Sequence, residues 1–249
     1  MKEVLQVVDL KKAYQKVEVL KGVTFNINER ETKVIIGPSG GGKSTLLYCI
    51  NMLVKPDSGS IILDGVDITR ERKIYKARQK IGFVFQHFNL FMHLTAIDNV
   101  RIGPIRVKSM SRSDATETAS EALKIVGISE NLWSHYPAQL SGGQQQRVAI
   151  ARAIAMSPRV ILFDEPTSAL DVELIGEVLN AMRNLTIKGV TMLVVTHEID
   201  FALDMAEEIL FLENGIILEK GPPKEILTNP KSERLKRFLS KLSKDRKEL

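Results

Sequence analysis

Residues 34–45 read VIIGPSGGGKST, an apolar run that leads through a glycine-rich loop into a helical pattern from Lys43 to Leu53. The apolar run Val34–Ile36 favours a β-strand. The loop has the spacing of a phosphate-binding loop, which is Gly, four residues, Gly, Lys, and Ser or Thr, set between a strand and a helix. At average composition this spacing arises by chance in roughly one chain in a hundred of this length. The segment therefore predicts a nucleotide-phosphate site in an α/β fold.

Each residue type in this loop suits the binding of phosphate. Glycines allow bare backbone N–H groups to wrap the phosphates, and the helix N-terminus adds partial positive charge. Lys43 is expected to reach the β- and γ-phosphates, and Ser44 to bind Mg²⁺. A simple glycine-rich turn would explain neither of these side chains. The predicted nucleotide-contacting residues of the loop are Ser39, Gly40, Gly41, Gly42, Lys43, Ser44 and Thr45.

Short apolar runs alternate with helical patterns along much of the chain. The predicted strands are Val4–Val8, Phe25–Ile27, Val34–Ile36, Ile61–Leu63, Ile81–Phe85, Val160–Phe163, Met192–Val195 and Ile209–Leu212. The predicted helices are Lys43–Leu53, Asp114–Val126, Gly143–Met156, Val172–Thr186 and Asp200–Ala206. Repetition of strand and then helix predicts a mainly parallel sheet covered by helices.

Two regions depart from this alternation. Residues 26–28 and the Asn214-Gly215 pair after Ile209–Leu212 indicate antiparallel hairpins, since Asn-Gly suits a tight primed turn. Residues 88–157 show helical patterns and loops but no convincing strand, which predicts a helical insertion.

A second chemical feature is the apolar strand Val160–Phe163, which ends in Asp164 and Glu165. A buried parallel strand has its carboxyl end at the edge of the sheet where ligands collect in open α/β folds. We therefore expect Asp164 to hold Mg²⁺, directly or through water, and Glu165 to orient and deprotonate the attacking water. An acidic pair after a strand is weak evidence alone, but a phosphate loop requires such a partner.

The third feature is LSGGQQQR, residues 140–147, at the start of a predicted helix. Ser141 is explained equally by an ordinary N-cap, and the two glycines by the end of a loop. A cap does not need Gly142 and Gly143 together, however, whereas a helix N-terminus that receives a phosphate closely does. Because this segment lies about a hundred residues from the phosphate loop, it is expected to serve a different nucleotide.

Composition excludes several other classes of protein. The net charge of +5 is carried by Lys and Arg that are scattered among acidic residues, so no nucleic-acid partner is expected. No apolar run reaches the roughly eighteen residues that cross a bilayer, and charges within residues 1–20 argue against a signal peptide. A single cysteine, Cys49, excludes an internal disulfide.

Residues 231–247 combine apolar residues at helical spacing with lysines, which predicts a docked amphipathic helix, with a membrane arm as the alternative.

Taken together, these segments resemble the nucleotide-binding subunits of ABC transporters. LSGGQ at residues 140–144 is similar to that family's signature, and the Gly37 loop and the Glu165 strand end are similar to its Walker A and Walker B motifs. The resemblance implies that Tyr14 stacks on adenine, that Gln86 senses Mg²⁺ and water, and that His197 faces the γ-phosphate. It also implies a D-loop at residues 168–171. Ser141, Gly142, Gly143, Gln144 and Asp171 would then contact nucleotide as well.

The resemblance implies an ABC ATPase fold, a mainly parallel P-loop NTPase sheet with an antiparallel β subdomain and a helical insertion. The whole of residues 1–249 would form one domain, with a RecA-like core at 1–87 and 158–230. Residues 88–157 would be the helical subdomain with the signature, and 231–249 a C-terminal amphipathic helix and tail. The implied catalytic residues are Lys43, Gln86, Glu165 and His197, and the implied Mg²⁺ ligands are Ser44, Gln86 and Asp164.

The resemblance also implies partners. Two copies would face head to tail, with each ATP between the phosphate loop of one copy and residues 141–143 of the other. Residues 86–99, with Phe88, Leu90, Phe91 and Leu94, would receive a helix of membrane permease subunits, although a core position is an equal explanation for any one of those four. The chain would thus work at the cytoplasmic side of the cell membrane.

Finer similarity, at FQHFNLF (85–91), DEPTSALD (164–171) and ELIGEVL (173–179), is to the polar amino acid uptake group of importers. The resemblance implies an extracellular solute-binding protein in the complete system and no regulatory domain after Leu249. Met92 and Val172 depart from that group, which usually has proline at both positions. The alternatives are an ATPase of a lipoprotein-releasing or peptide exporter, which shares LSGGQQQR, and an ABC ATPase without a transport role. The latter usually has a long coiled coil or two cassettes, and this sequence has neither.

Overall fold

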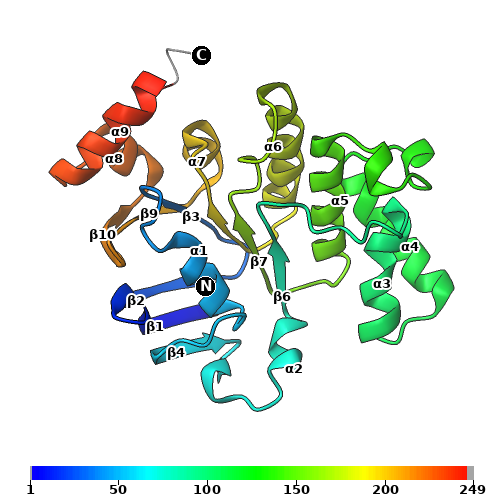
Figure 1. Cartoon of the computed structure of the whole chain (residues 1–249), viewed down its shortest axis with the longest axis horizontal. Coiled ribbons are helices and arrows are strands. Elements are labelled where there is room, and N and C mark those ends of the chain that lie inside the picture. The colour runs from blue at the N-terminus through cyan, green and yellow to red at the C-terminus, as the bar shows by residue number, and fades with distance from the viewer. Residues whose placement is uncertain (1, 246–249) are drawn as a thin grey trace. The chain divides into compact units, whose positions relative to one another are not determined.

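The computed structural model describes residues 2–245, with side chains as far as Leu242. The chain divides into two units, one made of Met1–Ile74 with Leu193–Leu249 and the other of Tyr75–Met192. Figure 1 labels most of their helices and strands. No helix within the described residues is both long and apolar enough to cross a membrane.

An antiparallel sheet opens the first unit, with strands in the order β2-β1-β4-β5. Its strands are β1 (Glu3–Tyr14), β2 (Val17–Asn28), β4 (Ser58–Leu63) and β5 (Val66–Asp67). Leu5, Val7 and Leu10 of β1 are fully buried, so that one face of the sheet joins the apolar core. The antiparallel pairing around residues 26–28 was predicted, whereas the two-residue strand β5 is too short to show a pattern.

The second sheet of this unit has the order β10-β9-β3-β8. It is built from β3 (Thr32–Ile36), β8 (Met192–Val195), β9 (Glu208–Glu213) and β10 (Ile216–Gly221). All five residues of β3 are buried, and β3 pairs in parallel with β9. β9 and β10 form the predicted antiparallel hairpin. Asn214 and Gly215 both have positive φ, 50° and 80°, as a primed turn requires.

Helices α1 (Lys43–Ile50), α7 (Ile199–Met205), α8 (Pro223–Thr228) and α9 (Glu233–Asp245), with the 3₁₀ turn η1 (Ile68–Arg70), complete the first unit. The final helix was predicted, although residues 246–249 lie outside the described part of the chain. Two contacts attach α9 to the hairpin. Arg234 Nε donates to Glu213 Oε2 at 3.0 Å, and the ring of Phe238 lies 5.4 Å from that of Phe211. Leu235 is fully buried, which confirms docking by the apolar face.

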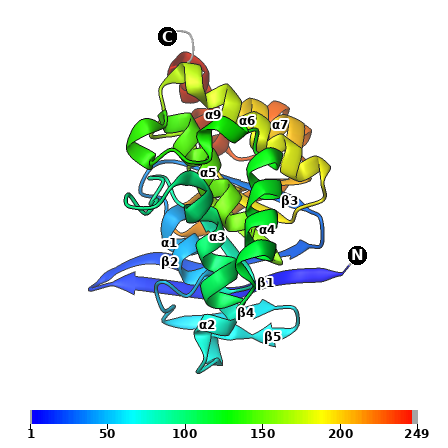
Figure 2. The same cartoon turned by 90° about the vertical axis from the view of Figure 1, so that its right-hand side faces the viewer.

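The second unit has a parallel pair of strands, β6 (Ile81–Val84) and β7 (Val160–Asp164). Its α-helices are α2 (Ile74–Arg78), α3 (Ala96–Val107), α4 (Arg112–Ile125), α5 (Gly142–Ile154) and α6 (Val172–Ile187), with 3₁₀ turns η2 (Glu130–Leu132) and η3 (Pro137–Gln139). Figure 2 shows α3, α4 and α5 grouped together. Residues 88–157 contain no strand, as predicted. Helix α3 was not predicted, because Gly103 and Pro104 interrupt its pattern, but Thr95 caps its start.

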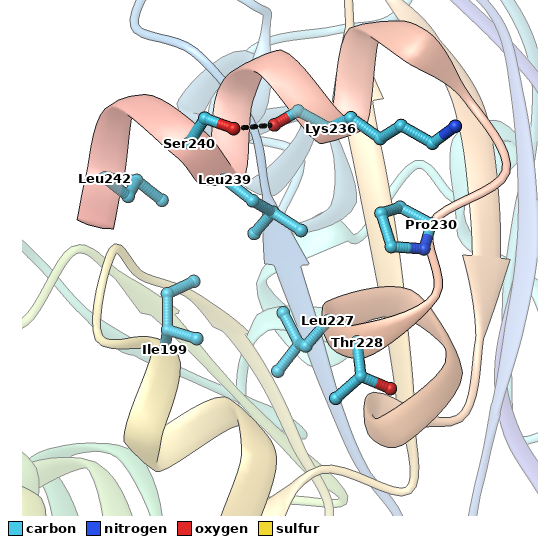
Figure 3. Close-up of a pocket in the computed structure, with 8 residues that line it drawn as sticks. All are labelled: Ile199, Leu227, Thr228, Pro230, Lys236, Leu239, Ser240 and Leu242. Carbon is cyan, nitrogen blue, oxygen red and sulfur yellow. Dashed lines mark hydrogen bonds between the residues drawn. The ribbon is translucent and has the colours of Figure 1, made fainter. Parts of the chain in front are cut away.

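One apolar groove lies where α9 meets α7 and α8. Figure 3 shows Leu239 and Leu242 of α9 on one side of this groove, and Ile199 and Leu227 on the other. The cavity is about 440 Å³ in volume. Its walls leave Leu242 half-buried, in contrast to Leu235.

This difference predicts the stability of two variants of α9. Leu235→Ala should lower the free energy of unfolding by about 3 kcal/mol, because a fully buried leucine leaves a cavity behind. Leu242→Ala should cost about 1 kcal/mol, because its site is already open to solvent. Urea denaturation followed by circular dichroism measures both. Equal, small losses would contradict the docking of α9 through Leu235.

Candidate functional site

The phosphate loop in the first unit is shaped by close contact with the β9–β10 hairpin. A Cβ atom at Gly37, where φ is 153°, would lie 2.0 Å from the carbonyl oxygen of Leu212. The turn of the hairpin also touches the loop, since the Gly215 N–H donates to the Gly41 carbonyl at 3.3 Å. The loop therefore rests on backbone, and no side chain fits at Gly37.

The N-terminus of helix α1 has features that favour the binding of an anion. Gly42 stands at its N-cap without a capping side chain, and its first turn has no acidic residue. The helix N-terminus consequently keeps its positive partial charge. Lys43 is 4% exposed, and its Nζ donates to the carbonyls of Gly37 and Pro38 at 3.0 and 3.1 Å. The ammonium thus lies over the loop, while Ser39 and Gly40 are exposed and Ser44 and Thr45 are half-buried.

Tyr14 stands at the end of β1, opposite Val17 in the β1–β2 hairpin. Its side chain is 46% exposed, and Lys12 Nζ lies 5.4 Å from the centre of its ring. The same hairpin approaches the phosphate loop, because a Cβ at Gly42 would lie 2.9 Å from the Val19 carbonyl oxygen. An exposed aromatic face near the loop is available for stacking.

His197 follows the end of β8 and is half-buried. The N–H of Thr196 donates to the carbonyl of Ile35 at 3.4 Å, two residues before Gly37. The first unit therefore brings Tyr14, the loop and His197 to one region, although these residues are far apart in the sequence.

In the second unit, β6 and β7 bring Gln86, Asp164 and Glu165 to one edge of the parallel pair. The register pairs Val84 with Phe163, so Gln86 lies two residues after the last paired residue of β6, and Asp164 and Glu165 lie one and two residues after that of β7. Asp164 is 2% exposed, while Gln86 is exposed. Glu165 has φ of 45°, a left-handed conformation that costs a non-glycine residue about 1 kcal/mol. Its carbonyl accepts from the N–H and Oγ of Ser168 at 3.2 and 2.9 Å.

The LSGGQ segment opens α5 with a capping box. The Gln144 N–H donates to Ser141 Oγ at 3.2 Å, and the Ser141 N–H donates to Gln144 Oε1 at 3.0 Å. The N-cap explanation of Ser141 is thus correct for the isolated chain. Ser141 is exposed, and so is Asp171, the N-cap of α6, which makes no side-chain capping bond.

The two signature glycines have a packing role that the sequence did not reveal. A Cβ at Gly142 would lie 3.0 Å from Leu170 Cδ2, and one at Gly143 would lie 3.3 Å from Leu174 Cβ. Both distances are tighter than ordinary van der Waals contact. A larger residue at either position would therefore require Leu170 or Leu174 to give way by a few tenths of an ångström, whether or not a phosphate approaches.

The loop after Gln86 presents only part of the expected apolar surface. Phe91 is 47% exposed, Phe88 and Leu94 are half-buried, and Leu90 is buried, so a core position is correct for Leu90.

Sequence reasoning missed Asn99, a fully buried amide. Its Oδ1 accepts from the Phe91 N–H at 2.8 Å, and its Nδ2 donates to the carbonyls of Phe91, Leu94 and Thr95. A polar residue on the apolar face of a predicted helix would have been the signal, but α3 was not predicted.

Comparison with known proteins identifies the family. The family model described as ABC transporter matches residues 20–168. The arginine transport ATP-binding protein ArtM of Bacillus subtilis is 48% identical over 96% of this chain and 99% of its own length. The glutamine transport ATP-binding protein GlnQ of Geobacillus stearothermophilus is 50% identical over 93% and 96% of the two chains. The histidine/lysine/arginine/ornithine transport ATP-binding protein HisP of Escherichia coli is 49% identical over 94% and 96%.

A solved dimer of the ABC transporter cassette MJ0796 is similar with a TM-score of 0.80 and 39% identity, over 88% of this chain and 98% of that one. These similarities agree with the fold, which contains an antiparallel sheet, parallel strands, a helical segment and a phosphate loop. The chain therefore belongs to the ABC transporter family, as one of its ATP-binding, ATP-hydrolysing subunits.

Proposed function

We propose that this protein is the ATPase subunit of an importer of polar amino acids. The observation that carries this proposal is the near-full-length similarity to ATP-binding proteins whose names state arginine, glutamine or histidine transport. ATP binding, closure of a dimer and hydrolysis would be coupled to uptake through membrane permease subunits. The solute itself would be chosen by those permeases and by an extracellular binding protein.

The proposed roles of the side chains follow from their surroundings. In the first unit, Tyr14 offers an exposed ring to adenine, while residues 39–45 hold the phosphates with Lys43 on the β- and γ-phosphates. His197 faces the γ-phosphate. In the second unit, Glu165 deprotonates the attacking water and Gln86 positions it, and both follow the ends of parallel strands.

The donor set fits Mg²⁺. Ser44 offers a hydroxyl in the first turn of α1, Asp164 a nearly fully buried carboxylate at the end of β7, and Gln86 an amide oxygen. Hard oxygen donors of this kind are what Mg²⁺ prefers. When bound, Mg²⁺ neutralises negative charge on the phosphates.

The proposed working form is a head-to-tail homodimer. Each ATP would be closed by Ser141, Gly142, Gly143 and Gln144 of the second copy, with Asp171 nearby. The N-terminus of the 13-residue helix α5 carries positive partial charge that suits a γ-phosphate. Ser141 Oγ and the N–H of Gln144 would then exchange their capping bond for contacts to nucleotide. The solved dimer of MJ0796 supports dimerisation in this family.

The proposed contact with the permeases is residues 86–99, at the cytoplasmic side of the membrane. Phe91 and its neighbour Met92 are 47% and 60% exposed there. Exposed large apolar side chains of this kind mark protein contacts when they occur together.

The proposed function is tested by reconstitution of this protein with the permeases and the binding protein of its transporter. Proteoliposomes containing the complete transporter should take up labelled arginine, glutamine or histidine in an ATP-dependent way, and the binding protein should stimulate ATP hydrolysis. Release of a lipoprotein or peptide in place of uptake would overturn the importer assignment.

Lys43→Ala should lower the rate of ATP hydrolysis by about a hundredfold, since one preorganised charge-stabilising donor is typically worth that much. Lys21→Ala, an exposed position on β2 of the same unit, serves as the control and should hydrolyse ATP normally. Phosphate release assays measure both variants. Near-normal turnover by Lys43→Ala would remove this residue from the proposed site.

Glu165→Gln should bind ATP normally but accumulate as a closed dimer with Mg-ATP, because the base is lost while the charge clamp remains. Light scattering of the purified variant with and without Mg-ATP measures its mass. A variant that stays monomeric under saturating Mg-ATP would contradict the dimeric arrangement.

A further inference from the structure

The backbone on both sides of Gln86 is held by side chains of helix α5. On one side, Gln146 Nε2 donates to the carbonyl oxygen of Phe85 at 3.1 Å. On the other, Arg152 donates from Nη1 to the Asn89 carbonyl at 2.7 Å and from Nη2 to the Phe88 carbonyl at 3.2 Å. The guanidinium of Arg152 also lies 5.8 Å from the centre of the Phe91 ring. Helix α5 thus fixes the segment of residues 85–89 at two separate points.

Gln146 differs from the two glutamines that precede it. Gln144 and Gln145 are half-buried, whereas Gln146 is 0% exposed. Its Oε1 has no hydrogen-bond partner among residues 2–245, so only the donor half of the amide is used. A buried acceptor without a partner is unfavourable, and an apolar side chain of similar length would avoid it. The bond to Phe85 is therefore the contact that accounts for an amide at this position.

This bond acts directly on the residue proposed to position the attacking water. The Phe85 carbonyl belongs to the same planar peptide group as the backbone nitrogen of Gln86. Holding that oxygen fixes the orientation of the peptide from which Gln86 extends. The side chain of Gln86 is exposed, so its own packing does little to hold it.

The same helix begins at the signature segment. Gln146 lies four residues after Gly142, one turn along α5, and a Cβ at Gly142 would lie 3.5 Å from Cζ of Phe88. A movement of the N-terminus of α5 therefore reaches the backbone beside Gln86 through rigid helix and one buried hydrogen bond.

We propose that Gln146 is a positioning residue for Gln86, which links the signature end of α5 to the residue that orients the attacking water. The inference rests on the proposed role of Gln86. Gln146 does not contact nucleotide in this proposal, and its effect on hydrolysis passes through the Phe85–Gln86 peptide alone.

A double-mutant cycle on the full-length protein tests the link. Gln146→Met keeps the length of the side chain and removes the donor. It should lower kcat for ATP hydrolysis by about tenfold, as loss of a residue that orients a catalytic group does, with KM for Mg-ATP unchanged. Gln86→Ala should also lower kcat. The double variant Gln86→Ala with Gln146→Met should match Gln86→Ala within twofold, because without the Gln86 side chain its orientation no longer matters.

Val148→Ala is the matched control for a general weakening of α5, since Val148 is fully buried in the same helix. It should lower thermal stability at least as much as Gln146→Met and leave kcat within twofold of the original protein. Multiplicative losses in the double variant, or an equal loss of kcat in Val148→Ala, would overturn the positioning role. An unchanged kcat in Gln86→Ala would instead refute the proposed role of Gln86 itself, which separates the two failures.

Discussion

Close approach of backbone to backbone at Gly37 is the constraint on which the first unit depends. The carbonyl oxygen of Leu212 lies where a side chain would begin, and the Gly215 turn donates to the same loop. Bare peptide groups held in this way keep N–H groups available for phosphate without a rearrangement on binding. Helix α1 contributes an N-terminus without a side-chain cap, and Lys43 Nζ donates to the carbonyl of Gly37 at the start of the loop. The hairpin that supports the loop is itself attached to α9 through Glu213 and Arg234.

In the second unit, helix α5 supports the proposed site, as the β9–β10 hairpin supports the phosphate loop in the first unit. Its N-terminus carries the signature, and its side chains Gln146, which is buried, and Arg152, which is half-buried, hold the backbone on both sides of Gln86. Glu165 is held at positive φ by the tight turn that its carbonyl makes with Ser168. The residues with proposed chemical roles are thus exposed or half-exposed, apart from Lys43, Asp164, Gly41, Gly42 and Gly143. Rigid support of this kind is what catalysis by positioning needs.

Most of the fold followed from local patterns, and the failures have physical reasons. Short apolar runs predicted the strands β1, β2, β3, β4, β6, β7, β8 and β9, the Asn214-Gly215 turn predicted the β9–β10 hairpin, and helical spacing predicted the helices α1, α4, α5, α6, α7 and α9. Helix α3 was missed because Pro104 and Gly103 disfavour helix locally, and tertiary packing outweighs that preference. Short elements such as β5 and α2 depend on their neighbours and have too few residues for a period to appear.

By itself, the sequence determined the chemistry of the protein. The spacing of Gly37, Lys43 and Ser44, the acidic strand end and LSGGQ together indicate ATP and a family, because each supplies a group that a nucleotide phosphate or a divalent cation needs. Only the tertiary structure decided which side chains pack against Gly142 and Gly143, how Asn99 holds its loop, and that Gln146 rather than Gln145 reaches Phe85. Contacts between residues distant in the chain depend on which face of each helix is buried, and that is settled by packing rather than by local spacing.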